Sequence, residues 1–191
     1  MKKIPPDNQR FPASGNPMSI EISPDRIRVA TCTITDRSLF LQWIRGIAQK
    51  FDTHIVCFNA RLMAGKRHAA FAVTLAFRAF EEGLNISNTP EMEALLFAAG
   101  SRQCTVAASF GVREGENQLL VCCLPEKDAC WTALEMRLRF NDFTDEEITQ
   151  EKQAELMAVY AITPDELAAA GGPGRLSDLV LERVALLQVF R

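Results

Sequence analysis

Hydrophobic and polar positions along the chain follow patterns that change from strand spacing to helical spacing. Residues 26–35 (RIRVATCTIT) alternate partly and are rich in β-branched side chains, which predicts a first strand. Residues 36–50 repeat apolar side chains at helical spacing behind Asp36, a residue type that caps helices. Residues 54–58 (HIVCF) predict a short second strand, and residues 117–124 (NQLLVCCL) predict a strand buried on both sides.

A long helix is predicted over residues 66–82, where alanines recur along one stripe and Gly83 follows as a terminator. The sequence TPE at residues 89–91 indicates a helix start, because proline loses no hydrogen bond at the first helical position and an acid suits the positive helix end. We expect this helix to end near Gly100. Ser101 is then predicted to cap a shorter helix.

The C-terminal part of the chain is predicted to be helical. Residues 144–147 and 163–166 both fit the capping box, in which a threonine hydroxyl and a carboxylate three residues later each satisfy a backbone amide. The turn GGPG at residues 171–174 precedes a last helix over residues 177–190, which is apolar nearly all round, as in a core or interface helix. These elements predict an α+β (α/β) fold with a small mixed β-sheet packed by several α-helices.

The composition indicates one folded domain behind an arm. Residues 1–24 contain several prolines among polar residues and no sustained apolar period, so we predict a flexible arm there and a single domain over residues 25–191. Hydrophobic residues make up 48% and charged residues 24% of the chain, which is ordinary for a globular protein. No apolar run is long enough to cross a membrane, and the start does not resemble a secretory signal. We therefore expect a cytoplasmic protein with free thiols and no membrane partner.

Groups suited to catalysis are few. The chain has two histidines, His54 and His68, and no evident nucleophile beside a positioned base, so we predict no catalytic residue and no cofactor. The pair GK at residues 65–66 lacks the earlier glycine and the following hydroxyl of a nucleotide-binding loop, which argues against a nucleotide triphosphatase. Cys122 and Cys123 are adjacent, so in a strand they point to opposite faces and cannot bind one metal ion together. We predict no metal site.

Basic and polar side chains able to bind phosphate gather in two stretches at predicted helix starts. Helix N-termini attract anions through their free amides, and added arginine and lysine concentrate positive potential there, although the net charge of the chain is −3. On composition alone, an RNA-binding surface and a merely solvated group of charges are both open. The candidate residues are Arg61, Lys66, Arg67, His68, Ser101, Arg102 and Gln103.

A longer pattern runs through the same stretches. Residues 58–103 contain, in order, the turn AGKRH, an alanine-striped helix ending in EEG, the turn NIS and a helix closing with AGSRQ. This pattern resembles the kinase-binding small subunit of the KEOPS complex, the TPRKB-like family. Residues 179–187 (LVLERVALL) also look like that family's C-terminal helix, so the resemblance covers about residues 26–190. The proline-containing arm and the adjacent cysteines depart from the family pattern.

The resemblance implies a non-catalytic subunit of the complex that makes threonylcarbamoyladenosine in tRNA. Its partners would be the small KEOPS kinase, through it the rest of the complex, and the 3′ end of tRNA. The basic candidates above would contact tRNA, with Lys66 and Arg102 the strongest among them. The positions that look characteristic of the family are His68, Arg78, Asn85, Ser87, Glu93, Gly100, Arg102 and Gln103.

Several roles for these positions follow as expectations. Asn85 and Ser87 are expected to shape the turn between two helices, and Glu93 to pair with an arginine. Apolar positions of the last helix that exceed one buried stripe are assigned to the kinase interface: Leu181, Leu187 and Phe190. Two alternatives stay open, a small anion- or ligand-binding enzyme using His68 and Arg102, and a protein that self-assembles through its last helix.

Overall fold

The computed structural model describes residues 20–141 and 148–189. Its sheet contains β1 (Arg28–Ile34), β2 (His54–Asn59), β3 (Gly115–Leu124) and β4 (Arg139–Asn141), in the order β2-β3-β1-β4. All three pairings are antiparallel, so the expected mixed sheet is wrong while the α+β class is confirmed. The reason is that β1 and β2, which run parallel to each other, are separated by β3.

Two helices cover one face of the sheet and form its crossover connections. They are α1 (Arg37–Lys50), between β1 and β2, and α5 (Asp128–Leu134), between β3 and β4. This order of strands and crossovers is the split βαβ pattern, with a helical insertion between β2 and β3. The core on this face includes Ile34, Phe40, Ile44, Leu119 and Trp131.

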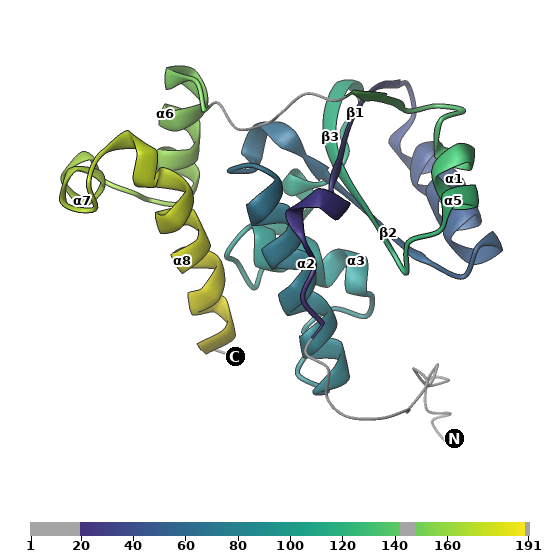
Figure 1. The fold of residues 1–191 in the computed structure, drawn as a ribbon, viewed down its shortest axis with the longest axis horizontal. Helices are drawn as coiled ribbons and strands as arrows, with labels where there is room; N and C mark the ends of the chain where they lie inside the picture. The colour runs from purple at the N-terminus through teal and green to yellow at the C-terminus, as the bar shows by residue number, and fades with distance from the viewer. Residues whose placement is uncertain (1–19, 142–147, 190–191) are drawn as a thin grey trace.

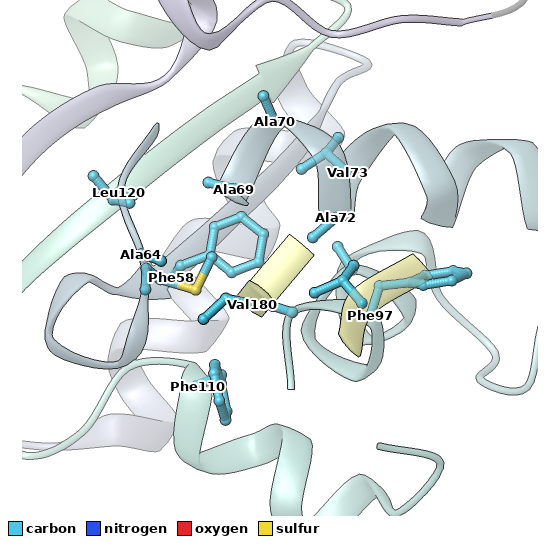
Figure 2. Close-up of a cluster of buried hydrophobic side chains, with 14 of the residues drawn as sticks. Phe58, Ala64, Ala69, Ala70, Ala72, Val73, Phe97, Phe110, Leu120 and Val180 are labelled. Atoms are coloured by element: carbon cyan, nitrogen blue, oxygen red, sulfur yellow. The ribbon is translucent and has the colours of Figure 1, made fainter. Parts of the chain in front are cut away.

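A second group of helices covers the other face. The alanine-striped helix α2 (Lys66–Glu81) lies there with α3 (Pro90–Ala98) and α8 (Leu176–Val189), and the core between them and the sheet is the larger of the two (Figure 2). Figure 1 shows the resulting order across the molecule: α6 to α8, then α2 and α3, then the sheet, then α1 and α5. The remaining elements are η1 (Pro24–Arg26), η2 (Ala60–Leu62), α4 (Cys104–Ala107), η3 (Ala108–Phe110), α6 (Gln150–Val159), α7 (Pro164–Ala169) and η4 (Pro173–Arg175).

Most predicted boundaries have the capping contacts expected of them. The side chains of Asp36, Thr89 and Thr163 accept hydrogen bonds from amides at the starts of α1, α3 and α7, as the sequence predicts. The capping box predicted at residues 144–147 lies outside the described residues. The next described helix, α6, begins behind Thr149. Elements α5 and β4 were missed, because both are short.

The helix predicted behind Ser101 begins two positions later than expected. Gln103 occupies the N-cap of α4, and the Ser101 hydroxyl instead accepts a hydrogen bond from the Gln103 amide. The cause is the end of α3, where Gly100 adopts φ +56° and the Ser101 amide turns back to donate to the Leu96 carbonyl. Ser101 therefore closes one helix and does not cap the next.

Packing of the N-terminal part begins earlier than predicted. Ile22 is buried, and its amide donates to the Thr74 hydroxyl on α2 at 3.0 Å. The Arg78 side chain donates from Nε to the Ile20 carbonyl at 3.3 Å. Residues 20–24 of the predicted arm thus lie against α2, while residues 1–19 fall outside the described part of the chain. Within that part, no helix has the length and apolar character that a membrane crossing requires.

Candidate functional site

His68 lies in the first turn of α2, with only 1% of its surface exposed. Its Nδ1 accepts a hydrogen bond from the Ala64 amide at 3.1 Å, so Nε2 carries the proton and donates to the Ala98 carbonyl at 3.1 Å. Burial lowers the pKa of His68 to about 4, which keeps the ring neutral at pH 7. Both ring nitrogens are engaged inside the protein, so the predictions of tRNA contact or catalysis by this side chain do not fit its position.

Arg61 lies on η2 and is held by α6. Its Nε donates to Glu155 Oε2 at 2.6 Å, and its guanidinium also lies 3.9 Å from Glu151 Oε1. Since two carboxylates offset its charge, Arg61 adds little positive potential to the surface.

Lys66 and Arg67 begin α2, and Arg67 reaches α8. Arg67 Nη1 donates to Asp178 Oδ1 at 2.9 Å, and Arg175 Nη1 donates to Asp178 Oδ2, also at 2.9 Å. Two guanidinium groups therefore share one carboxylate and keep one net positive charge between them. Gly65 holds the N-cap of α2 at φ +93° without a side-chain cap. The positive end of the α2 dipole adds to the charge of these side chains.

The second basic stretch follows α3 and also meets α8. Gly100 lies against α8, and a Cβ built on it would make an ordinary contact, 3.5 Å from the Arg183 carbonyl oxygen. Arg102 and Gln103 are exposed, and Ser101 is half-buried. Because His68 ties the start of α2 to the end of α3, Lys66, Arg67 and residues 101–103 flank the same helix, α8. The structure thus brings together most of the predicted residues, whereas Arg61 is tied to α6 and His68 is buried.

The turn between α2 and α3 is built by three of the characteristic positions. Asn85 Nδ2 donates to the Ser87 carbonyl at 2.8 Å, as expected of residues that shape a turn. Glu93 is fully buried, and its Oε2 accepts from the Ser87 amide at 2.7 Å and from the Ile86 amide at 3.1 Å. An arginine partner for Glu93 stays a prediction. These contacts make the turn a fixed part of the fold.

Residues assigned to the kinase interface have different environments on α8. Leu187 is 6% exposed and belongs to the large core, and Leu181 is half-buried. Phe190 lies outside the described residues. The exposed apolar side chains of α8 are Leu186 and Val189, with 37% and 72% of their surface exposed. The apolar pattern could not separate these positions, because α8 is apolar on nearly every side.

Tyr160 was missed by sequence reasoning, although it completes the contact between α2 and α3. Its hydroxyl donates to the Ala98 carbonyl at 2.7 Å, beside His68, and its ring packs edge-on against the His68 ring. Asp178 was missed as the partner of Arg67. Asp178 lies far from Arg67 in sequence, and Tyr160 lies far from Ala98 and His68, so no local pattern signals these contacts.

The cysteines are placed as packing residues in most cases. Cys122 belongs to the larger core and Cys123 to the smaller one, which confirms that the adjacent pair points to opposite faces. Burial raises the pKa of Cys122 to about 12 and also raises that of Cys123. Their thiols therefore stay protonated at neutral pH.

A comparison with protein families identifies the family of this chain. Residues 33–188 match the family described as kinase binding protein CGI-121. The match spans both basic stretches, the turn between α2 and α3, and α8 up to its penultimate residue. No curated protein matches the chain. The chain belongs to the CGI-121 family of kinase-binding proteins, the TPRKB-like KEOPS subunit family that its sequence resembles.

Proposed function

We propose that this chain is the non-catalytic cytoplasmic subunit of KEOPS that binds the small kinase of the complex and helps recruit tRNA through its 3′ end. In that role it serves the threonylcarbamoyladenosine modification of tRNA without chemistry of its own. The observation that carries the proposal is membership in a kinase-binding family over residues 33–188. The enzyme alternative loses its candidate base, because His68 is buried and both of its ring nitrogens are hydrogen-bonded to the backbone.

The proposed kinase surface is the exposed apolar side of α8. Leu186 and Val189 project from the last turns of this helix, and Leu181 is partly accessible. Apolar side chains left open at one helix end support a protein interface, since association removes them from water. Leu187 belongs to this proposal only indirectly, because it anchors α8 in the core.

The kinase proposal is tested with the double variant Leu186→Glu and Val189→Glu. We expect binding to the purified kinase subunit, measured by calorimetry, to weaken at least about tenfold, because two charges would enter an apolar contact. Val159→Glu on α6 is a control of similar exposure and should bind normally. Unchanged affinity of the double variant, with circular dichroism like that of the parent, would place the kinase elsewhere.

Leu187→Glu separates core from interface. A carboxylate in the large core should lower the free energy of unfolding by about 3 kcal/mol or more, because it is buried without a partner. Urea unfolding measures this loss directly. If this variant stays as stable as the parent and loses only kinase affinity, the original assignment of Leu187 to the interface is right.

The proposed tRNA surface is the basic border of α8, formed by Lys66, Arg67 and the exposed residues Arg102 and Gln103. Arg175 adds its charge next to Arg67 through their shared partner, Asp178. The positive end of the α2 dipole lies in the same place. A single-stranded 3′ end suits such a surface, since proteins read unstacked ends more readily than the deep groove of an RNA duplex.

The tRNA proposal is tested by filter binding of Arg102→Glu at several salt concentrations. We expect weaker binding and a salt dependence reduced by roughly one unit of slope for each lost phosphate contact. Arg61→Gln is the comparison variant, and it should lose less, because Arg61 is tied to Glu155 and Glu151 of α6, outside the proposed surface. Removing the 3′ terminal nucleotides of the tRNA should lower the affinity of the parent protein by a larger factor than it lowers the affinity of the Arg102→Glu variant.

Two results would contradict the tRNA proposal. One is equal tRNA binding by Arg102→Glu and the parent, with both folded. The other is a larger loss of tRNA affinity in Arg61→Gln than in Arg102→Glu, which would place the RNA-binding surface nearer to α6. Because α8 borders the basic residues, kinase binding should be measured on the same variants, and Arg102→Glu should retain it.

A further inference from the structure

A carboxylate lies within the basic border of α8. Asp178 is the third residue of this helix, and its two oxygens are shared between arginines of two other elements. Oδ1 accepts a hydrogen bond from Arg67 of α2, and Oδ2 accepts one from Arg175 of η4, each at 2.9 Å. Each arginine therefore gives one of its N–H groups to Asp178 when no RNA is bound.

The fold fixes the place of this carboxylate. Asp178 lies in the first turn of α8, where the positive end of the helix dipole stabilises an acid. The neighbouring Ser177 hydroxyl donates to the Ala64 carbonyl at 3.5 Å, which ties the start of α8 to the chain that enters α2. The side chain of Asp178 is 33% exposed, whereas those of Arg67 and Arg175 are 68% and 60% exposed. The two arginines are thus more open to a ligand than the carboxylate between them.

A carboxylate at this place opposes phosphate binding. It repels the RNA backbone, and it competes with phosphate for the same guanidinium groups, because both anions accept charge-assisted hydrogen bonds from arginine. Exposed ion pairs contribute little to folding stability, so the stability of the fold alone gives a weak reason for the two pairs with Asp178.

We infer that Asp178 limits how tightly the proposed tRNA surface holds RNA and promotes release of the bound RNA. The inference rests on the proposed tRNA function. A phosphate that approaches Arg67 or Arg175 must displace the Asp178 carboxylate before the guanidinium is fully available. When the phosphate leaves, the carboxylate re-forms its ion pairs, so the bound state gains less from these arginines than it would without Asp178.

Such competition suits a protein that recruits tRNA and then releases it. Phosphate contacts strengthen binding to RNA of any sequence, so a border with uncompensated basic side chains would retain any RNA backbone. Release of product limits the turnover of many enzymes, and a recruiting subunit that held its tRNA too long would slow the complex in the same way. The basic side chains concerned are Lys66, Arg67, Arg102 and Arg175.

The test compares two variants that each remove one negative charge from the same side of α8. Asp178→Asn removes the carboxylate that the two arginines share. Glu182→Gln is the matched control, because Glu182 lies one helical turn further on, is exposed and forms no ion pair with a described residue. A labelled, unmodified tRNA transcript is the probe, with affinity measured by filter binding and rates by biolayer interferometry.

Asp178→Asn should bind this tRNA more tightly than the parent by a factor of about three or more, since two exposed ion pairs no longer compete. The gain should come mainly from slower dissociation, because the competing contact is short-ranged. Glu182→Gln should instead act mainly on the association rate, since a charge outside the contact changes only the long-range field.

A double-mutant cycle identifies the arginines as the contested groups. Arg67→Gln and Arg175→Gln should each lower tRNA affinity by a larger factor in the Asp178→Asn background than in the parent. The reason is that, in the parent, part of each arginine's interaction with phosphate is offset by the ion pair that must break. Repulsion between Asp178 and RNA, acting through space alone, predicts the same factor in both backgrounds.

Asp178→Ser is a second variant without the carboxylate, and it should give the same gain, because serine also suits a helix start. Urea unfolding checks that both variants are folded. The inference is overturned if neither variant binds tRNA more tightly than the parent, if Glu182→Gln slows dissociation equally, or if the cycle shows no coupling. If the parent binds tRNA, such a result leaves the proposed tRNA function standing. If neither the parent nor the variants bind tRNA, the proposed tRNA surface fails as well.

Discussion

At the scale of single residues, the Ala98 carbonyl accepts hydrogen bonds from the one tyrosine of the chain and from its buried histidine. His68 and Tyr160 both donate to this oxygen, from α2 and from the end of α6. His68 is also bonded to the Ala64 amide. The imidazole therefore joins three backbone segments while it stays neutral, and its value to the protein is structural.

The buried His68 makes stability depend on pH. Its pKa is lowered from 6.5 to about 4, so on acidification the unfolded chain binds a proton that the folded chain refuses. Stability is therefore full above about pH 6.5 and falls between there and about pH 4. This group alone should cost about 2 kcal/mol of unfolding free energy between pH 7 and pH 5. Urea unfolding at both pH values measures it.

His68→Gln is the matched variant, because its amide can still donate and accept but cannot titrate. We expect lower stability at pH 7 and a pH dependence flatter by about 2 kcal/mol over the same interval. An identical pH dependence in the parent and the variant would show that His68 is accessible to protons in the folded state.

At the scale of elements, α2 and α3 end in the same way. Gly83 and Gly100 both follow their helices with positive φ, and in each case two amides turn back to donate to carbonyls of the last turn. This is the Schellman motif, which both glycines signal in the sequence. Only Gly100 meets another helix, through the Arg183 carbonyl.

Alanine substitution at these glycines tests whether the left-handed backbone or the contact with α8 requires a glycine. Gly83→Ala and Gly100→Ala should each lower the free energy of unfolding by about 1 kcal/mol, because a side chain strains the left-handed backbone. The costs should be similar, since a Cβ at position 100 would make ordinary contacts of 3.5 Å or more and none within 4 Å at position 83. A much larger loss at position 100, measured by urea unfolding, would mean that α3 and α8 tolerate no added atom.

At the scale of the whole molecule, one sheet supports two cores, and the N-terminal segment closes the larger one. Ile22 is 5% exposed and packs with the helices on that face, and its amide is bonded to Thr74. The folded unit therefore includes residues before the predicted domain boundary at 25.

Truncation tests where the folded unit begins. A chain of residues 25–191 should be less stable than one of residues 20–191 by about 3 kcal/mol, because it loses the burial of Ile22 and its hydrogen bond. Ile22→Ala in the full chain should lose about 2 kcal/mol. Both chains should unfold in one transition if residues 25–191 are a single domain. Equal stability of the two chains would show that the arm adds nothing.

The sequence by itself determined the local elements. Asp36, Thr89 and Thr163 marked helix starts, and Gly83 and Gly100 marked helix ends, because capping depends on atoms only a few residues apart. The family pattern across residues 58–103 also located the two basic stretches that flank α8.

Only the tertiary structure decided which surfaces are available. Strand order is nonlocal, so the antiparallel sheet could not be read from strands predicted one at a time, and β4 is too short to show alternation. His68 and Leu187 are buried, whereas Arg102 and Val189 are exposed. The sequence assigned His68 and Arg102 to one site and counted Leu187 and Val189 in one apolar helix, and it could not show this difference in burial. The ion pair of Asp178 with Arg67 was also decided by the tertiary structure, because it joins residues far apart in the chain. Periodicity gives a side chain its place on a helix, but the packing of other helices decides whether water or a partner can reach it.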